Sequence, residues 1–233
     1  MFTKNSYWLG IDIGSISCKA VLLNSQKEVV FSFYEKTYGD SQKTLKKVWR
    51  QIFAFLQEAG GIVMDAGATG AGKQLIAAFT GVRHIFNEIL AHSYGALHFV
   101  PTAKTIIEIG GQDSKLILIR DGTVHDFALN TICAAGTGSF LDQQRLRFNL
   151  DYDAFISLSL QSQNPVAING GCAVFAESDM LNFQQLGFPL PDILAGLHLA
   201  LARNFLANLG KGKKLESPIV FQGGVSQNRA MQK

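Results

Sequence analysis

The fold is decided by the stretch Thr105-Ile106-Ile107-Glu108-Ile109-Gly110-Gly111-Gln112-Asp113. An apolar run that ends in two glycines and two polar residues is typical of a β-strand followed by a tight turn. Two further apolar runs follow at Lys115–Ile119 and Thr123–Leu129. Asp121-Gly122 between them predicts a hairpin turn. We therefore expect three consecutive strands in this part of the chain.

The first part of the chain repeats this order. Apolar runs at Tyr7–Ile13, Ser17–Leu23 and Glu28–Tyr34 predict three strands, and Asp12-Ile13-Gly14-Ser15 is the turn after the first. Helical periodicity and apolar runs predict the later elements: the helices Asp40–Ala59, Ala71–Phe79, Asn87–Phe99, Ser139–Phe148, Ala173–Leu186 and Pro191–Leu209, and the strands Ile62–Ala66 and Pro218–Gln222.

This repetition predicts an α/β protein built from two similar βββαβα lobes, residues 1–101 and 102–233, with a cleft between them. An ordinary α/β domain without internal symmetry is the alternative.

Composition excludes several classes of protein. The 233 residues are 47% hydrophobic, which is ample for a packed core, and 21 Lys and Arg against 18 Asp and Glu give a net charge of only +3. A nucleic-acid binder usually has a concentrated basic face, so we expect no nucleic-acid partner. No apolar run has the length of a membrane span, and the N-terminus lacks the layout of a signal peptide. With only three cysteines, we expect a cytoplasmic protein without a disulfide framework.

Gly67-Ala68-Thr69-Gly70-Ala71-Gly72-Lys73 has the glycine spacing of a phosphate-binding P-loop. That motif needs Ser or Thr after the lysine to ligate magnesium, and Gln74 stands there instead. We therefore interpret the stretch as a glycine-rich turn between a strand and a helix.

Three glycine turns at strand ends predict the nucleotide site. They are Asp12-Ile13-Gly14-Ser15, Gly110-Gly111-Gln112-Asp113 and Gly223-Gly224-Val225-Ser226. Two hairpin turns from facing lobes can grip a polyphosphate, because glycine lets backbone N–H groups approach the oxygens closely.

Polar side chains around these turns complete the predicted site. Ser15, Ser17 and Lys19 would add donors to the phosphates, and Asp12 and Asp113 would hold Mg²⁺ through water. Gly223-Gly224 would leave a flat slot for adenine, with Asn228 nearby.

This layout resembles that of the superfamily of acetate kinase, sugar kinases, the heat-shock chaperone ATPase and actin, whose lobes are ribonuclease H-like. The resemblance implies an actin-like ATPase fold with ATP in the cleft. The second phosphate turn of that superfamily commonly opens with Asp, whereas this chain has Glu108. Glu108, Gln112 and Asp113 therefore all remain candidates for positioning the attacking water.

Two cysteines lie in glycine-rich loops that lead into helices, Cys133 in residues 130–140 and Cys172 in residues 169–179. The positive end of a helix dipole stabilises a thiolate and an anionic cluster bound to it. The alternative is a core role, because lone cysteines are often buried, and that is our interpretation of Cys18.

Several segments resemble the activators of 2-hydroxyacyl-CoA dehydratases and the related ATPase subunits of benzoyl-CoA reductase. They are residues 110–115, 133–141, 172–179 and 222–228, together with Glu88 and His92, which match a Glu-x-x-x-His stretch of that family.

The resemblance implies one 4Fe-4S cluster that bridges a homodimer, with Cys133 and Cys172 of each chain as its ligands. It also implies that ATP hydrolysis drives a low-potential electron into a partner dehydratase or reductase, with ferredoxin or flavodoxin as electron donor, in an anaerobic setting. The family continues beyond the adenine loop, so we expect further C-terminal elements that this chain lacks. The rival hypothesis is a sugar or acid kinase of the same fold.

Overall fold

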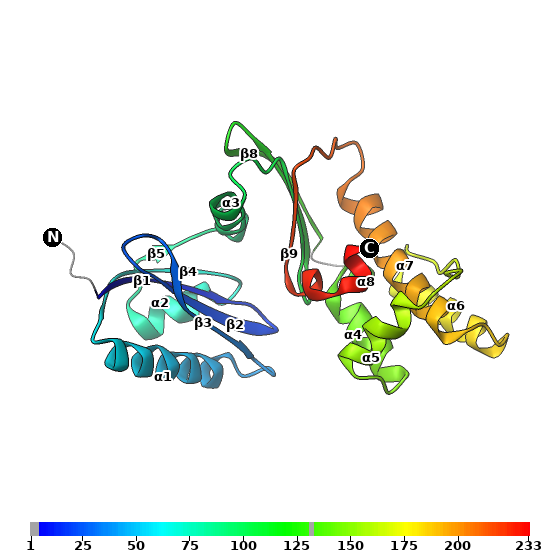
Figure 1. Cartoon of the computed structure of the whole chain (residues 1–233), viewed down its shortest axis with the longest axis horizontal. Helices are drawn as coiled ribbons and strands as arrows, with labels where there is room; N and C mark the ends of the chain where they lie inside the picture. Colours follow the sequence, from blue (N-terminus) through cyan, green and yellow to red (C-terminus); the bar gives the residue numbers. More distant parts are fainter. Residues whose placement is uncertain (1–4, 131–132) are drawn as a thin grey trace. The chain divides into compact units, whose positions relative to one another are not determined.

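The computed structural model describes residues 5–130 and 133–233. The chain forms two compact units, unit 1 (Met1–His92) and unit 2 (Ser93–Lys233), and each contains its own β-sheet (Figure 1). The division falls inside helix α3 (Glu88–Phe99), whereas we expected it at residues 101 and 102. The assignment of residues 1–101 and 102–233 as functional lobes stays a prediction.

Unit 1 contains a five-stranded sheet of order β3-β2-β1-β4-β5. β1, β2 and β3 are antiparallel, and β4 and β5 continue the sheet in parallel to β1. The strands are β1 (Ser6–Ile13), β2 (Ser17–Leu23), β3 (Val29–Lys36), β4 (Ile62–Thr69) and β5 (His84–Ile85).

Helices α1 (Ser41–Ala59) and α2 (Lys73–Thr80) pack on unit 1's sheet. Alternate residues of β1, such as Leu9 and Ile11, are buried in the same core as Val48 of α1 and Ile76 of α2. Strict alternation along the strand is the signature of one buried sheet face, and Figure 1 shows α1 running along the sheet.

Helix α1 begins and ends where its sequence dictates. The Asp40 carboxylate accepts a hydrogen bond from Lys43 N at 2.9 Å, which satisfies one of the free donors of the first turn. Gly60 ends the helix in the left-handed conformation, with φ of 62°, which glycine adopts without steric cost.

Unit 2 repeats the first four strands of unit 1. Its sheet has the order β8-β7-β6-β9, in which β6, β7 and β8 are antiparallel and β9 is parallel to β6. The strands are β6 (Thr105–Ile109), β7 (Ser114–Arg120), β8 (Thr123–Asn130) and β9 (Ile219–Gln222).

Helices between β8 and β9 supply most of the core of unit 2. One face of α7 is buried against the sheet and the neighbouring helices, including Leu197 and Leu201. The helical elements between β8 and β9 are η1 (Ala134–Gly136), α4 (Gly138–Arg147), α5 (Tyr152–Leu160), α6 (Ala173–Gln185) and α7 (Leu190–Leu209). η2 (Gly224–Gln227) and α8 (Arg229–Gln232) follow β9.

The α/β class, the repeated strand order and every expected strand and helix are confirmed, with small shifts at their ends. β5, α5 and the short 3₁₀ turns η1 and η2 were not predicted from the sequence. The carboxylate of Asp151, which accepts from Ala154 N at 2.7 Å, was the available signal for α5. In the described parts of the chain, no helix combines the length and apolarity needed to cross a membrane.

Phe155→Ala tests the core of unit 2. Phe155 on α5 is 1% exposed, so its removal leaves a cavity and should lower the free energy of unfolding by about 3–5 kcal/mol. Phe127→Ala is the matched control, because Phe127 is 49% exposed and should cost about 1 kcal/mol or less. Urea unfolding measures both, and equal losses would contradict this description of the core.

Candidate functional site

The turn Asp12-Ile13-Gly14-Ser15, called here the first phosphate turn after its predicted role, lies at the end of β1. Asp12 and Lys19 are cross-strand partners, and the Lys19 ammonium donates to the Asp12 carboxylate at 2.8 Å. Gly14 N donates to Ser17 O at 2.9 Å and closes the turn. Both charged side chains remain partly exposed, 31% for Asp12 and 46% for Lys19. The turn therefore presents a carboxylate and an ammonium group to solvent.

The second phosphate turn has the same geometry. Glu108 and Lys115 are cross-strand partners, seven positions apart in sequence like Asp12 and Lys19. Gly110 N donates to Asp113 O at 2.9 Å, as Gly14 N does to Ser17 O. The internal duplication therefore extends to the hydrogen bond that closes each turn.

The second turn differs from the first in burial. Lys115 donates to the carboxylates of Glu108 at 3.0 Å and of Asp113 at 2.8 Å. The Lys115 and Glu108 side chains are each only 5% exposed. Burial by itself lowers the pKa of the Lys115 ammonium group, but the negative charges of Glu108 and Asp113 outweigh it and raise that pKa above its usual value. Lys115 thus fixes the carboxylates of Glu108 and Asp113. Of these three side chains, only that of Asp113 is substantially exposed, at 37%.

The expected adenine loop, Gly223-Gly224-Val225-Ser226, touches the second phosphate turn, Gly110-Gly111-Gln112-Asp113, within unit 2. Gln222, the residue before the loop, is the strand partner of Glu108. Gly223 has φ of 89°, and a Cβ atom there would lie 2.7 Å from the Glu108 Oε1 atom. Only glycine fits this position, because both the backbone conformation and the neighbouring carboxylate exclude a side chain.

Asn228 is completely buried and holds the adenine loop in place. Its Nδ2 donates to His198 Nε2 at 2.9 Å, and its Oδ1 accepts from Ala230 N at 2.9 Å. His198 is then neutral, and burial lowers its pKa. Asn228 therefore shapes the loop from within, and its predicted contact with a nucleotide stays a prediction.

The P-loop-like stretch is a strand-to-helix turn, as expected. β4 ends at Thr69 and α2 begins at Lys73. Gly72 N donates to Ile13 O at 2.9 Å, and a Cβ atom at Gly70 would collide with the Asp12 carboxylate. These glycines allow β4 to pack against the first phosphate turn.

Both loop cysteines begin helical elements and are partly exposed. Cys133 is the N-cap residue of η1 and Cys172 that of α6. Thr131 and Ile132 of the first loop lie outside the described residues. Asn204 on α7 donates to the Cys133 Sγ atom at 3.6 Å and to Gly170 O, in the second loop, at 2.5 Å. One side chain therefore links the two cysteine loops.

Cys18 differs from the other two cysteines. It is fully buried in unit 1, and burial, together with the nearby charge of Asp12, raises its pKa to about 12. A thiol with this pKa is almost entirely protonated at neutral pH and is inert. The interpretation of Cys18 as a core residue is confirmed. Within residues 5–130 and 133–233, three or more His, Cys, Asp or Glu side chains do not gather into a metal site.

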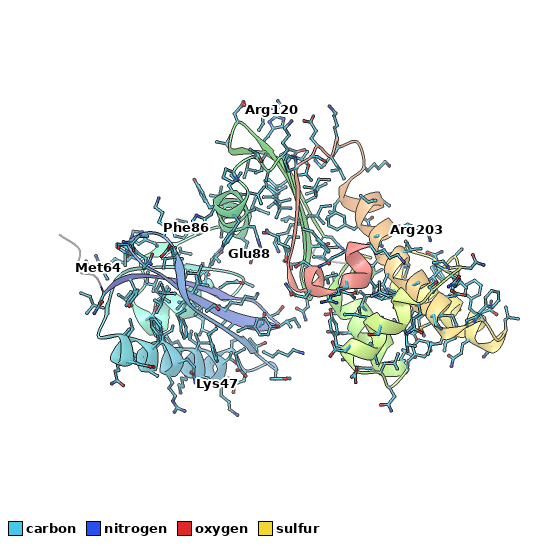
Figure 2. The ribbon with its side chains drawn as sticks, in the orientation of Figure 1. Lys47, Met64, Phe86, Glu88, Arg120 and Arg203 are labelled. Carbon is cyan, nitrogen blue, oxygen red and sulfur yellow. The ribbon has the colours of Figure 1, made fainter. Side chains whose placement is uncertain are left out.

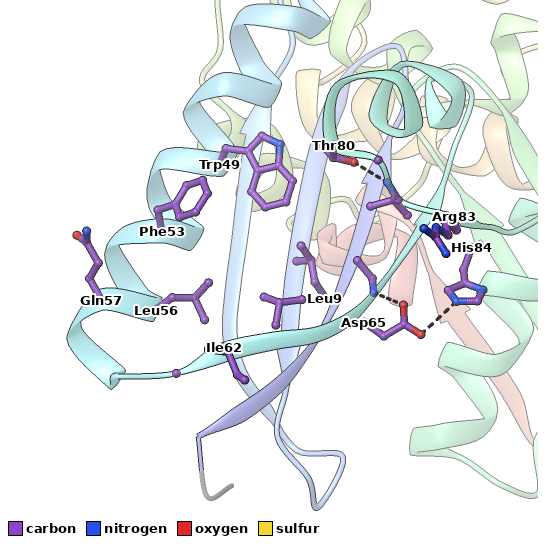
Figure 3. A pocket seen from close by; sticks show the side chains of 15 residues that line it. Leu9, Trp49, Phe53, Leu56, Gln57, Ile62, Asp65, Thr80, Arg83 and His84 are labelled. Carbon is purple, nitrogen blue, oxygen red and sulfur yellow. Dashed lines mark hydrogen bonds and ion pairs between the residues drawn. The ribbon is translucent and has the colours of Figure 1, made fainter. Parts of the chain in front are cut away.

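A pocket of about 760 Å³ lies in unit 1 (Figure 3). Apolar side chains of α1 and of the first half of β4 line it, including Trp49, Phe53 and Ile62, and the Asp65–His84 ion pair lies at its edge. β1 and β4 run in parallel. The pocket is lined by the first half of β4, whereas the first phosphate turn follows the C-terminal end of β1, so within unit 1 the two lie toward opposite ends of the sheet.

Sequence reasoning missed Lys115 and Asn204 as parts of the site. The equal spacing of Asp12–Lys19 and Glu108–Lys115 was a signal that could have found Lys115. Asn204 carries no such signal, since it lies in an ordinary helical pattern. Glu88, labelled in Figure 2, begins α3, and His92 follows one turn later.

The chain is similar to known proteins along almost its whole length. Residues 9–233 match the model of the BadF/BadG/BcrA/BcrD ATPase family. The activator of lactoyl-CoA dehydratase from Anaerotignum propionicum is 35% identical over 95% of this chain and 84% of its own length.

Two solved structures are similar along almost the whole chain. Component A of (R)-2-hydroxyglutaryl-CoA dehydratase from Acidaminococcus fermentans is 31% identical, with a TM-score of 0.87 over 97% of this chain and 86% of that one. The activator of 2-hydroxyisocaproyl-CoA dehydratase from Clostridium difficile, solved with bound ADPNP, is 30% identical, with a TM-score of 0.85 over 97% and 82%. The expected actin-like ATPase fold is confirmed.

Lys115→Met and Lys19→Met form a matched pair. Lys115→Met removes the buried ammonium partner of the Glu108 carboxylate, which should lower the free energy of unfolding by about 3–5 kcal/mol. The exposed Lys19 should contribute about 1 kcal/mol or less. Urea unfolding at neutral pH measures both variants. Equal losses would show that the two duplicated turns do not differ in this way.

Proposed function

Because this chain belongs to the BadF/BadG/BcrA/BcrD ATPase family and is therefore an ATPase, we propose that it uses ATP hydrolysis to send a low-potential electron into a partner CoA-ester dehydratase or reductase. The observation that carries the proposal is the joining of the two cysteine loops by Asn204, in the same unit as the second phosphate turn. A small-molecule kinase would not need such a pair of thiols.

The nucleotide would be held by residues of both units. In unit 1, Gly14 would border the phosphates while its N–H group closes the turn on Ser17 O, and donors of Ser15, Ser17 and Lys19 would bind phosphate oxygens. The Asp12–Lys19 ion pair is exposed and so can exchange its partners for Mg²⁺ and phosphate.

In unit 2, Gly110, Gly111 and Gln112 would bind the phosphates, and Gly223 and Gly224 would border the adenine. Asp113 is exposed and would hold Mg²⁺ through water. Glu108 is buried and paired with Lys115, which favours Gln112 and Asp113 over Glu108 as the residues that position the attacking water.

The residues of this chain fit half of a 4Fe-4S site. Cys133 and Cys172 are partly exposed at the starts of η1 and α6, and a cubane cluster takes four thiolates. A second copy of the chain would supply the other two. When bound, the cluster would accept and release a low-potential electron.

The surface beside Cys172 suits contact with a second copy. Val174 is 72% exposed and Phe175 62%, and both follow Cys172 directly in the first turn of α6. Burying such side chains stabilises an interface. A homodimer that shares the cluster would cover them. Ferredoxin or flavodoxin in the cytoplasm would then reduce the dimer.

Asp12→Asn tests the nucleotide site. The change removes a charge that positions Mg²⁺ with little change in shape, so ATPase activity should fall by about a hundredfold or more. Lys73→Ala is the control, because the P-loop-like turn should not bind phosphate, and its activity should stay within about twofold of normal. Loss of activity in Lys73→Ala beside an active Asp12→Asn would contradict this placement of ATP.

Iron content tests the shared cluster. A cubane bridging two identical chains corresponds to about two iron atoms per chain. Cys133→Ser or Cys172→Ser removes two of the four ligands at once, so each variant should lose the brown colour of anaerobically reconstituted protein and shift toward monomer on a sizing column. Cys18→Ala should keep both colour and dimer. A brown monomer with about four iron atoms per chain would contradict the proposal.

A further inference from the structure

The start of helix α4 is hydrogen-bonded to the second phosphate turn. Gly138 N donates to Gly110 O at 2.8 Å, and Ser139 N donates to Gly111 O at 2.8 Å. The Ser139 hydroxyl group donates to the same Gly111 carbonyl oxygen. Gly110 and Gly111, the two glycines of the turn that are expected to border the phosphates, are therefore bound, through their carbonyl groups, to the helix that follows the Cys133 loop.

Close packing reinforces this contact. A Cβ atom at Gly138 would lie 2.9 Å from a Val225 methyl group and 3.0 Å from Gly110 O. Val225 belongs to η2, just after the adenine-loop glycines. The start of α4 thus touches both the second phosphate turn and the adenine loop, with no room for a side chain between them.

A short rigid segment connects this contact to Cys133. Thr137 N and the Thr137 hydroxyl group both donate to Ala134 O, at 3.0 and 2.8 Å. Gly136 is buried, and a Cβ atom there would lie 2.6 Å from Asn204 Oδ1. Ser139 and Cys133 are therefore joined by a short, hydrogen-bonded and closely packed segment of the chain.

Asn204 carries the connection on to the second cysteine loop. It lies on α7 next to Arg203, which Figure 2 labels, and bonds both the Cys133 Sγ atom and Gly170 O. Asn208, one turn further along α7, donates to Asn204 Oδ1 at 3.0 Å and fixes its side chain. The chain of contacts runs from the phosphate turn to both cysteine loops within unit 2.

We propose that Ser139 is a positioning residue that relays the occupancy of the second phosphate turn to the Cys133 and Cys172 loops. The relay rests on the proposed function, since it assumes that nucleotide phosphates bind Gly110 and Gly111. A bound phosphate reorients the peptide groups of this turn, and the Gly111 carbonyl then draws the Ser139 N–H and hydroxyl groups with it. A ligand shifts such an equilibrium only through its different affinity for the two arrangements.

Thiol reactivity in the full chain, freed of iron with a chelator, measures the relay without relying on electron transfer. Alkylation of each cysteine by iodoacetamide is followed by peptide mass spectrometry, with and without Mg²⁺ and ADPNP. One hydrogen bond corresponds to about a fivefold change in an equilibrium. ADPNP should therefore change the alkylation rate of Cys133 by about fivefold or more, while buried Cys18 stays unreactive.

Variants separate the relay from nucleotide binding. Ser139→Ala keeps the backbone bond to Gly111 O and loses the hydroxyl bond, so it should bind ADPNP with a Kd within about threefold of normal, yet its Cys133 rate should respond less than about half as strongly as in the unaltered chain. Ser139→Thr keeps the hydroxyl group and should restore the response. Ser178→Ala on α6 is the matched control, because Ser178 is exposed, and it should respond as the unaltered chain does.

The outcomes distinguish the relay from the proposed function. If ADPNP binds the unaltered chain but leaves the Cys133 rate unchanged, the relay is overturned and the ATPase assignment stands. A Ser139→Ala variant that keeps the full response, or that loses ADPNP binding itself, also overturns the relay. Failure of the unaltered chain to bind ADPNP overturns both the relay and the proposed nucleotide site.

Discussion

The candidate site in unit 2 depends on the buried ion pair between Lys115 and Glu108. Two charges withdrawn from water are stable only while each keeps the other, because their hydration has been lost. The Glu108 carboxylate lies so close to Gly223 that this position cannot hold a side chain, and at Gly110 a Cβ atom would lie 2.9 Å from Asp113 Oδ1 and 3.2 Å from Glu108 Oε1. One buried pair thus fixes the second phosphate turn, the start of the adenine loop and, through Asp113, the carboxylate available to a metal ion.

The same hairpin serves different purposes in the two units. Asp12 and Lys19 repeat the spacing and the strand register of Glu108 and Lys115, but they remain partly exposed. An exposed pair in high-dielectric surroundings is weak and can be replaced by ligand contacts at little cost. A buried pair cannot be replaced in this way. The first phosphate turn therefore has an ion pair that a ligand can displace. The second has a buried ion pair that keeps the turn fixed, and α4 packs against that turn.

Much of the fold followed from local signals, whereas the connections within the site did not. Alternation of apolar residues and glycine turns predicted β1 and β6, and Asp40 with Gly60 bounded α1, because these signals act over a few neighbouring residues. α5 was missed because its short Ser-containing pattern shows little helical periodicity. Asn204 and Ser139 matter only through partners that are 71 and 28 positions away, and no local pattern encodes such contacts. The sequence placed the cysteines in separate loops, and only the structure shows α7 joining them.

The Asn204 side chain makes the two cysteines of the proposed cluster site unequal. Among the described residues, Cys133 Sγ accepts a side-chain hydrogen bond and Cys172 Sγ accepts none. A donor beside a thiolate stabilises its negative charge, and hydrogen bonds to cluster sulfurs are one way in which a protein sets a reduction potential. Because Asn204 also holds Gly170 O, a movement of either cysteine loop would alter this bond. A change in loop position and a change in the electrostatic surroundings of Cys133 would then be the same event. An ATP-driven electron donor requires such a link between movement and potential.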